Sequence, residues 1–141
     1  MIRELKFRVW DKTSDSMLYQ DDFERVELDT KNKMVTLIAE EESDKSHYVL
    51  DYEDGIEAEI LQYTGLKDKD GQDIYEGDIL INTNKSKLNL GMDNQKYLVV
   101  YKTLGFYLKP LFKGIALKFD YSDLKKLGNI YENPELLEGE R

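Results

Sequence analysis

The alternation of apolar and polar residues along the chain predicts a protein built mainly of β-strands. From Leu5 to Trp10 apolar positions alternate with mostly polar ones, a pattern typical of a strand with one buried face. Short apolar segments rich in β-branched and aromatic residues follow at intervals along the chain. They predict further strands at residues 17–19, 26–28, 34–38, 48–50, 60–63, 79–81, 97–101, 106–108 and 115–119. Many short strands separated by polar turns favour a barrel-like β fold.

Polar segments between these strands predict the turns and loops. Asp70-Gly71 is the strongest hairpin signal, because Asp-Gly readily adopts the backbone angles of a tight turn. A second hairpin is expected to turn near Leu104-Gly105. Residues 40–46 form the most polar run and are expected to be an exposed loop, and residues 82–95 are expected to form a long polar loop.

Helix signals are confined to the C-terminal part of the chain. Residues 122–128 begin with a serine that can cap a helix and end with a glycine that can stop one. Residues 133–137 offer an asparagine cap followed by proline at the first helical position. The expected fold class is therefore mainly β, with one or two short C-terminal helices.

Size and composition favour a single cytoplasmic domain. The chain has 141 residues, which suits one hydrophobic core. It contains no cysteine, so disulfides and thiolate metal sites are excluded, and this fits a reducing compartment. No apolar segment is long enough to cross a membrane, and the first residues lack the apolar stretch of a signal peptide.

The charge is unevenly distributed. The net charge is −9, from 29 acidic and 20 basic residues. Acidic residues dominate positions 13–62, whereas positions 82–118 contain many lysines and a single acid, Asp93. An acidic protein is disfavoured as a non-specific nucleic-acid binder, because that binding depends on Lys and Arg neutralising phosphates. An ordinary solvated surface accounts for both segments as well.

No catalytic, metal or nucleotide motif stands out. His47 is the only histidine and lies in a polar segment without a partner motif, so a surface position is expected. Asp68, Asp70 and Gly71 resemble part of a calcium loop, but its first and last ligand positions are Leu66 and Gly77. A hairpin turn is expected there instead. No phosphate-binding loop or nucleophile elbow is present, so we expect no cofactor and no metal.

Lysines interleaved with tyrosines form the one candidate binding pattern. Single-strand-binding barrels stack bases on aromatic rings beside a cationic groove. The candidate nucleic-acid-binding residues are Lys96, Tyr101, Lys102, Tyr107 and Lys109. Half-exposed strands with no binding role often show the same alternation, so this alternative stays open.

Four segments together resemble the YopX family, small proteins of phages and prophages of Gram-positive bacteria. They are residues 5–12 (LKFRVWDK), 61–79 (LQYTGLKDKDGQDIYEGDI), 105–108 (GFYL) and 128–137 (GNIYENPELL). The resemblance implies a complex β-barrel with an N-terminal β portion, no enzymatic activity and no catalytic residues. We therefore expect residues 1–141 to form one domain, with an N-terminal β portion at 1–60 and a barrel at 61–141.

The matching segments also have structural explanations. Gly65 and Gly77 stand where the backbone must turn, and Asp78 can accept hydrogen bonds from amides of its own turn. Asn129 and Asn133 can cap the terminal segment.

Besides an enzyme of a type that the sequence does not identify, three functional hypotheses follow. The first is a non-enzymatic phage accessory protein that acts through contacts with itself, as a homo-oligomer, or with a host or phage protein. The second is a nucleic-acid-binding barrel that uses the lysines of the basic segment, namely Lys85, Lys87, Lys96, Lys102, Lys109, Lys113 and Lys118. The third is an acidic mimic of nucleic acid that inhibits a host DNA-binding enzyme.

Overall fold

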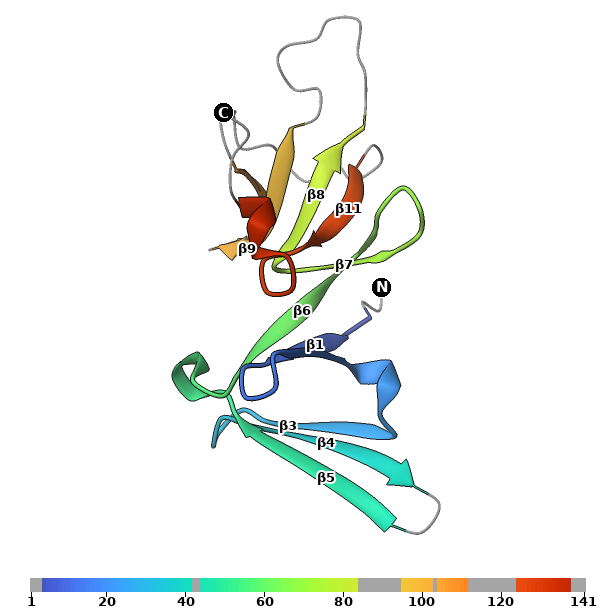
Figure 1. Ribbon diagram of the computed structural model, residues 1–141, viewed down its shortest axis with the longest axis vertical. Coiled ribbons are helices and arrows are strands. Elements are labelled where there is room, and N and C mark those ends of the chain that lie inside the picture. The colour runs from blue at the N-terminus through green and yellow to red at the C-terminus, as the bar shows by residue number, and fades with distance from the viewer. Residues whose placement is uncertain (1–3, 42–43, 84–94, 103, 112–123, 138–141) are drawn as a thin grey trace, which may run out of the picture. The chain divides into compact units, whose positions relative to one another are not determined.

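The computed structural model describes residues 4–41, 44–83, 95–102, 104–111 and 124–137, with the backbone alone for 40–41 and 44–47. Over this part of the chain it contains eleven β-strands, three short 3₁₀ helices and no α-helix. The strands form three antiparallel sheets, one of which is a half-barrel (Figure 1). The chain divides into two compact units, residues 6–62 and residues 63–141 together with 1–5. The mainly β class is thus confirmed.

The N-terminal unit contains two sheet regions, one that includes the first half of β6 (Ala58–Lys67) and one that does not. Strands β1 and β2 form a hairpin, and β1 also pairs with the first half of β6. Strands β3, β4 and β5 form a separate three-stranded sheet (Figure 1). The bounds are β1 (Phe7–Asp11), β2 (Ser16–Tyr19), η1 (Gln20–Asp22), β3 (Arg25–Asp29), β4 (Met34–Glu41), β5 (Asp44–Asp51), η2 (Glu53–Gly55) and β6 (Ala58–Lys67).

The core of this unit follows from the two-residue period of its strands. Val9 of β1, Val35 and Leu37 of β4, and Leu50 of β5 are buried together with Ala58. Each large aliphatic side chain removed from water contributes about 1.5–3 kcal/mol to folding. The first turn is closed by buried Asp11, whose carboxylate accepts hydrogen bonds from Thr13 and Ser14.

The C-terminal unit is built around a four-stranded sheet with the order β10-β9-β8-β11. The second half of β6 pairs with β7 across the Asp70-Gly71 turn, which confirms the predicted hairpin. The core consists of Ile74, Leu80, Tyr97, Val99, Leu108 and Leu124. The bounds are β7 (Asp73–Tyr75), β8 (Asp78–Asn82), β9 (Lys96–Lys102), β10 (Gly105–Pro110), β11 (Leu124–Asn129) and η3 (Pro134–Leu137).

Of the two predicted C-terminal helices, the first is wrong over its described residues, and the second is present only as a short 3₁₀ helix. Residues 124–128 belong to strand β11, which pairs with β8 along its length. The cap signals of this segment are local, whereas the pairing with β8 satisfies its backbone groups through a strand more than forty residues away. Residues 134–137 form a single 3₁₀ turn, η3, instead of an α-helix.

The polar run at 40–46 was also wrongly expected to be a loop. Strand β4 extends to Glu41 and β5 begins at Asp44, with Glu41 opposite Asp44 in the ladder. Ladder pairing therefore outweighs the low strand propensity of acidic residues here. The strand expected at 115–119 and most of the loop expected at 82–95 lie outside the described residues.

Candidate functional site

The β9–β10 hairpin separates its residues between two faces. Tyr97, Val99 and Leu108 are buried in the core. Because successive strand residues point to opposite sides, the alternate positions face away from that core. The pairing register sets Leu98 opposite Lys109 and Val100 opposite Tyr107. We call this outer surface the lysine face; it consists of Lys96, Leu98, Val100, Lys102, Tyr107 and Lys109.

The lysine face brings together four of the five residues predicted to bind nucleic acid: Lys96, Lys102, Tyr107 and Lys109. The fifth, Tyr101, lies on the opposite side of β9, five positions from Lys96. Tyr101 is 59% exposed as a residue, and its ring packs edge-on against Phe106, with ring centroids 5.2 Å apart. The predicted pair of stacking aromatics is therefore split between two faces.

The lysine face is cationic around a partly apolar centre. Lys102 and Lys109 are exposed, while Leu98, Val100 and Tyr107 are half-buried. Lys125 of β11 lies opposite Ile81, which lies opposite Lys96, so the register adds another lysine to the same side of the sheet. Among the described strand positions of β8–β11 that point this way, none is acidic.

The net charge of the protein is carried by the other unit. Residues 6–62 contain 16 acidic and 7 basic residues, a net of −9. Residues 1–5 and 63–141 contain 13 of each and are neutral overall. The lysine face therefore lies on a neutral unit, while an acidic unit belongs to the same chain.

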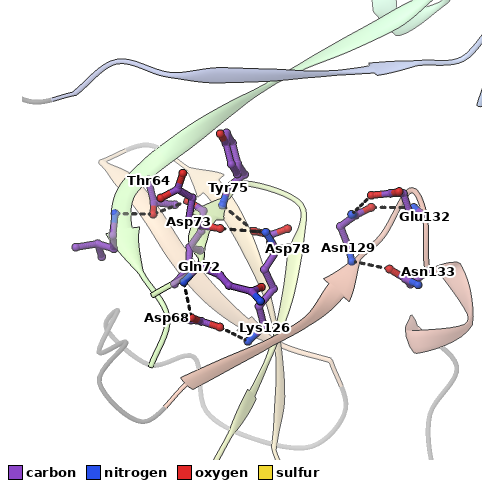
Figure 2. A network of polar contacts seen from close by, with 12 residues as sticks. Thr64, Asp68, Gln72, Asp73, Tyr75, Asp78, Lys126, Asn129, Glu132 and Asn133 are labelled. Atoms are coloured by element: carbon purple, nitrogen blue, oxygen red, sulfur yellow. Dashed lines mark hydrogen bonds and ion pairs between the residues drawn. The ribbon is translucent and has the colours of Figure 1, made fainter. Parts of the chain in front are cut away.

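A network of polar contacts, shown in Figure 2, holds the C-terminal unit together. Asp78 is fully buried, and its Oδ2 accepts a hydrogen bond from the Tyr75 amide at 2.8 Å. The Nζ of Lys126 lies 3.1 Å from the same oxygen and donates to the carbonyl of Asp73 at 3.0 Å. This ion pair connects β8 to β11 and to β7. The turn role of Asp78 was predicted from the sequence, whereas its ion pair with Lys126 was not.

Asp68 closes the β6–β7 hairpin and joins it to β11. Its Oδ1 accepts the amides of Asp70 and Gln72, each at 2.9 Å, and its Oδ2 accepts the Lys126 amide at 2.9 Å (Figure 2). Burial raises the pKa of this carboxyl, but the amides of Lys126, Gln72 and Asp70 and the charge of Lys126 outweigh burial and lower it. Gly71 adopts a positive φ of 84° in the turn. Asp68, the first carboxylate of the segment that resembles part of a calcium loop, thus accepts hydrogen bonds from backbone amides.

Two asparagines cap the turn after β11, as predicted. Asn129 Oδ1 accepts the amides of Tyr131 at 3.0 Å and Glu132 at 2.8 Å. Asn133 Oδ1 accepts the Asn129 amide at 3.2 Å (Figure 2). A Cβ at Gly128 would lie within 2.7 Å of the Asn133 Cγ, so only glycine leaves room for this cap.

These networks perform structural work. The carboxylates of Asp68 and Asp78 and the amide oxygens of Asn129 and Asn133 each accept backbone hydrogen bonds. In the part of the chain that the structure describes, no three His, Asp or Glu side chains gather to hold a metal, and no helix is long and apolar enough to cross a membrane. His47 occupies β5 opposite Ile38. The lysine face is therefore the best candidate for a functional surface.

Comparison with known proteins places this fold in a family. The family model described as YopX protein matches residues 6–138. The chain belongs to the YopX protein family.

Two solved structures share the YopX fold over their whole length. Protein EF1440 from Enterococcus faecalis is 27% identical, with a TM-score of 0.64, and the match covers 97% of this chain and 100% of that one. Protein yopX from Bacillus subtilis is 22% identical, with a TM-score of 0.61, and the match covers 99% and 100%. No curated protein matches the chain.

Proposed function

We propose that this YopX family protein is a non-enzymatic phage or prophage accessory protein that acts through protein–protein contacts and forms a homo-oligomer. The lysine face is the proposed contact surface. The observation that carries the proposal is the gathering of Lys96, Lys102 and Lys109 around half-buried Leu98 and Val100, with no acid among the described positions of that side.

The physical basis is the composition of this surface. Protein interfaces combine a partly apolar centre with a polar rim, and they are enriched in tyrosine, as at Tyr107. Complementary charge across the rim speeds encounter and selects the partner. The lysine face is therefore complementary in charge to an acidic surface on a partner protein.

A second candidate, single-stranded nucleic acid, is favoured by the same grouping of lysines on one side. Lys102 and Lys109 flank Tyr107, whose ring could stack a base. Two observations favour a protein partner instead. Tyr101 lies on the opposite side of β9, and the −9 charge of the N-terminal unit would repel a long polyanion.

Sedimentation velocity over a dilution series tests the proposal. We expect the wild-type protein to self-associate as its concentration rises, and the double variant Lys102→Glu/Lys109→Glu to remain monomeric further up the series. Fluorescence anisotropy with a labelled single-stranded oligonucleotide at low salt runs in parallel. A monomeric wild-type protein that binds the oligonucleotide through these lysines would overturn the proposal in favour of the second candidate.

A further inference from the structure

The sheet β3–β4–β5 carries an outer face of the opposite charge. Val35, Leu37 and Leu50 point into the core of the N-terminal unit, so the alternate positions point away from it. The register aligns Glu27, Thr36 and Val49 in one row across the three strands. It aligns Asp29, Met34 and Asp51 in the next row. We call these six residues the acidic face.

The acidic face also combines a charged rim with an apolar centre. Val49 is 50% exposed, and Met34 and Thr36 are half-buried. Glu27 and Asp29 are exposed at the β3 side. Arg25 shares this side, but its Nε lies 2.8 Å from the Glu27 carboxylate. The three carboxylates of the acidic face, those of Glu27, Asp29 and Asp51, outnumber this one cation, so these residues together carry a net negative charge.

The lysine face and the acidic face complement each other in two respects. Each is the side of an antiparallel sheet that faces away from the core of its own unit, with partly buried apolar residues near its centre. Ile79 beside Leu98 and Ile38 beside Thr36 are buried on these same sides, so the exposed area lies around them. Each has a rim of one dominant sign, provided by lysines on β9–β10 and by carboxylates on β3–β5. Apolar burial at the centre and opposite charges at the rim are the features of a specific interface.

We infer that the lysine face of one copy of this protein binds the acidic face of a second copy. This inference rests on the proposed function, because it names the partner surface of the proposed contact. Each copy contributes two different surfaces, so the contact is head-to-tail. Charge complementarity within one chain selects a second copy over a different acidic protein as the occupant.

Complementation between two charge-reversed variants tests the head-to-tail arrangement. The first variant is Lys102→Glu/Lys109→Glu, which reverses the lysine face. The second is Glu27→Lys/Val49→Lys, which makes one row of the acidic face positive. Each variant alone should associate with itself at least about tenfold more weakly than wild type, since like charges across an interface cost several kcal/mol. An equimolar mixture should recover association, because each variant keeps the face that the other has lost.

Matched controls separate position from total charge. Lys69→Glu changes the charge of the C-terminal unit at an exposed turn away from β9–β10, and Asp22→Lys does the same in η1 of the N-terminal unit. Both should associate like wild type in sedimentation velocity. Far-UV circular dichroism and urea unfolding confirm that all four variants are folded.

The outcomes distinguish this inference from the proposal beneath it. If wild type associates but the mixture does not recover, the partner surface is wrong while the homo-oligomer stands. If wild type is monomeric throughout, both fail. If wild type is monomeric and binds the oligonucleotide, and the variant Lys102→Glu/Lys109→Glu does not bind it, the lysine face binds nucleic acid and the inference is overturned.

Discussion

Replacing Asp68 by asparagine should destabilise the C-terminal unit through a single mismatched hydrogen bond. Asp68 is 6% exposed, and its two oxygens accept three backbone amides. The asparagine oxygen can keep the amides of Asp70 and Gln72. Its NH₂ group would then face the Lys126 amide, so two donors would meet where a donor and an acceptor meet now.

The magnitude follows from the bonds lost. A hydrogen bond to a charged group contributes about 1.5–3 kcal/mol, and a buried amide without an acceptor costs about 1–3 kcal/mol. These two effects overlap at the same amide. We therefore expect Asp68→Asn to lower the free energy of unfolding by about 2–4 kcal/mol. The control Asp70→Asn alters an exposed carboxylate two residues away and should change it by less than about 0.5 kcal/mol.

Urea unfolding followed by far-UV circular dichroism measures this difference, and hydrogen exchange of the Lys126 amide localises it. Trp10, the only tryptophan, lies in the N-terminal unit, so its fluorescence serves as an internal reference for that unit. Exchange at Lys126 should accelerate in Asp68→Asn. Equal stability of Asp68→Asn and Asp70→Asn, with unchanged exchange at Lys126, would refute the reasoning.

Three further predictions concern stability. Gly128→Ala forces a Cβ against the Asn133 side chain and should cost about 1–3 kcal/mol in urea unfolding, and an unchanged midpoint would contradict the packing. Tyr97→Phe removes a buried hydroxyl that has no hydrogen-bond partner among the described residues. Thermal unfolding should therefore show a free energy of unfolding that is unchanged or higher by up to about 1 kcal/mol. A clear decrease in the free energy of unfolding would mean that the hydroxyl forms a hydrogen bond. Burial raises the pKa of Asp11, but the hydroxyls of Ser14 and Thr13 and their amides lower it more, to below its ordinary value of 3.8. Its stabilisation is therefore present above that value and is lost as the pH falls through the lowered pKa, so Asp11→Asn should flatten the loss of stability as the pH falls below 3.8 in a urea titration series.

The strands of this protein could be predicted because their signal is local. Alternation of buried and exposed positions at Phe7–Asp11 and Lys96–Lys102 is set by the two-residue period of a strand. The turn roles of Asp78, Asn129 and Asn133 were likewise predictable, because their side chains bind amides within four residues. The same two-residue period also implies that Tyr101 and Lys102 point to opposite sides of their strand. The interleaving of lysines and tyrosines had instead suggested that both belong to one binding surface.

The lysine face shows how far local information extends. The period alone places Lys96, Leu98, Val100 and Lys102 on one side of β9. Only the register decides that Tyr107 and Lys109 join them, since a shift by one residue would have turned both to the core. Lys125 joins through the pairing of β11 with β8, which no sequence neighbour specifies.

The sequence by itself determined the mainly β class, the hairpin turns and the separation of an acidic N-terminal part from a lysine-rich segment, because propensity, alternation and charge are properties of neighbouring residues. The tertiary structure decided that residues 124–129 form a strand, that Lys126 pairs with Asp78, and which charged side chains share a face. These outcomes depend on ladder hydrogen bonds and ion pairs between segments about fifty residues apart. Contacts at that separation outweigh the local cap signals of Ser122 and Gly128, and no local pattern encodes them.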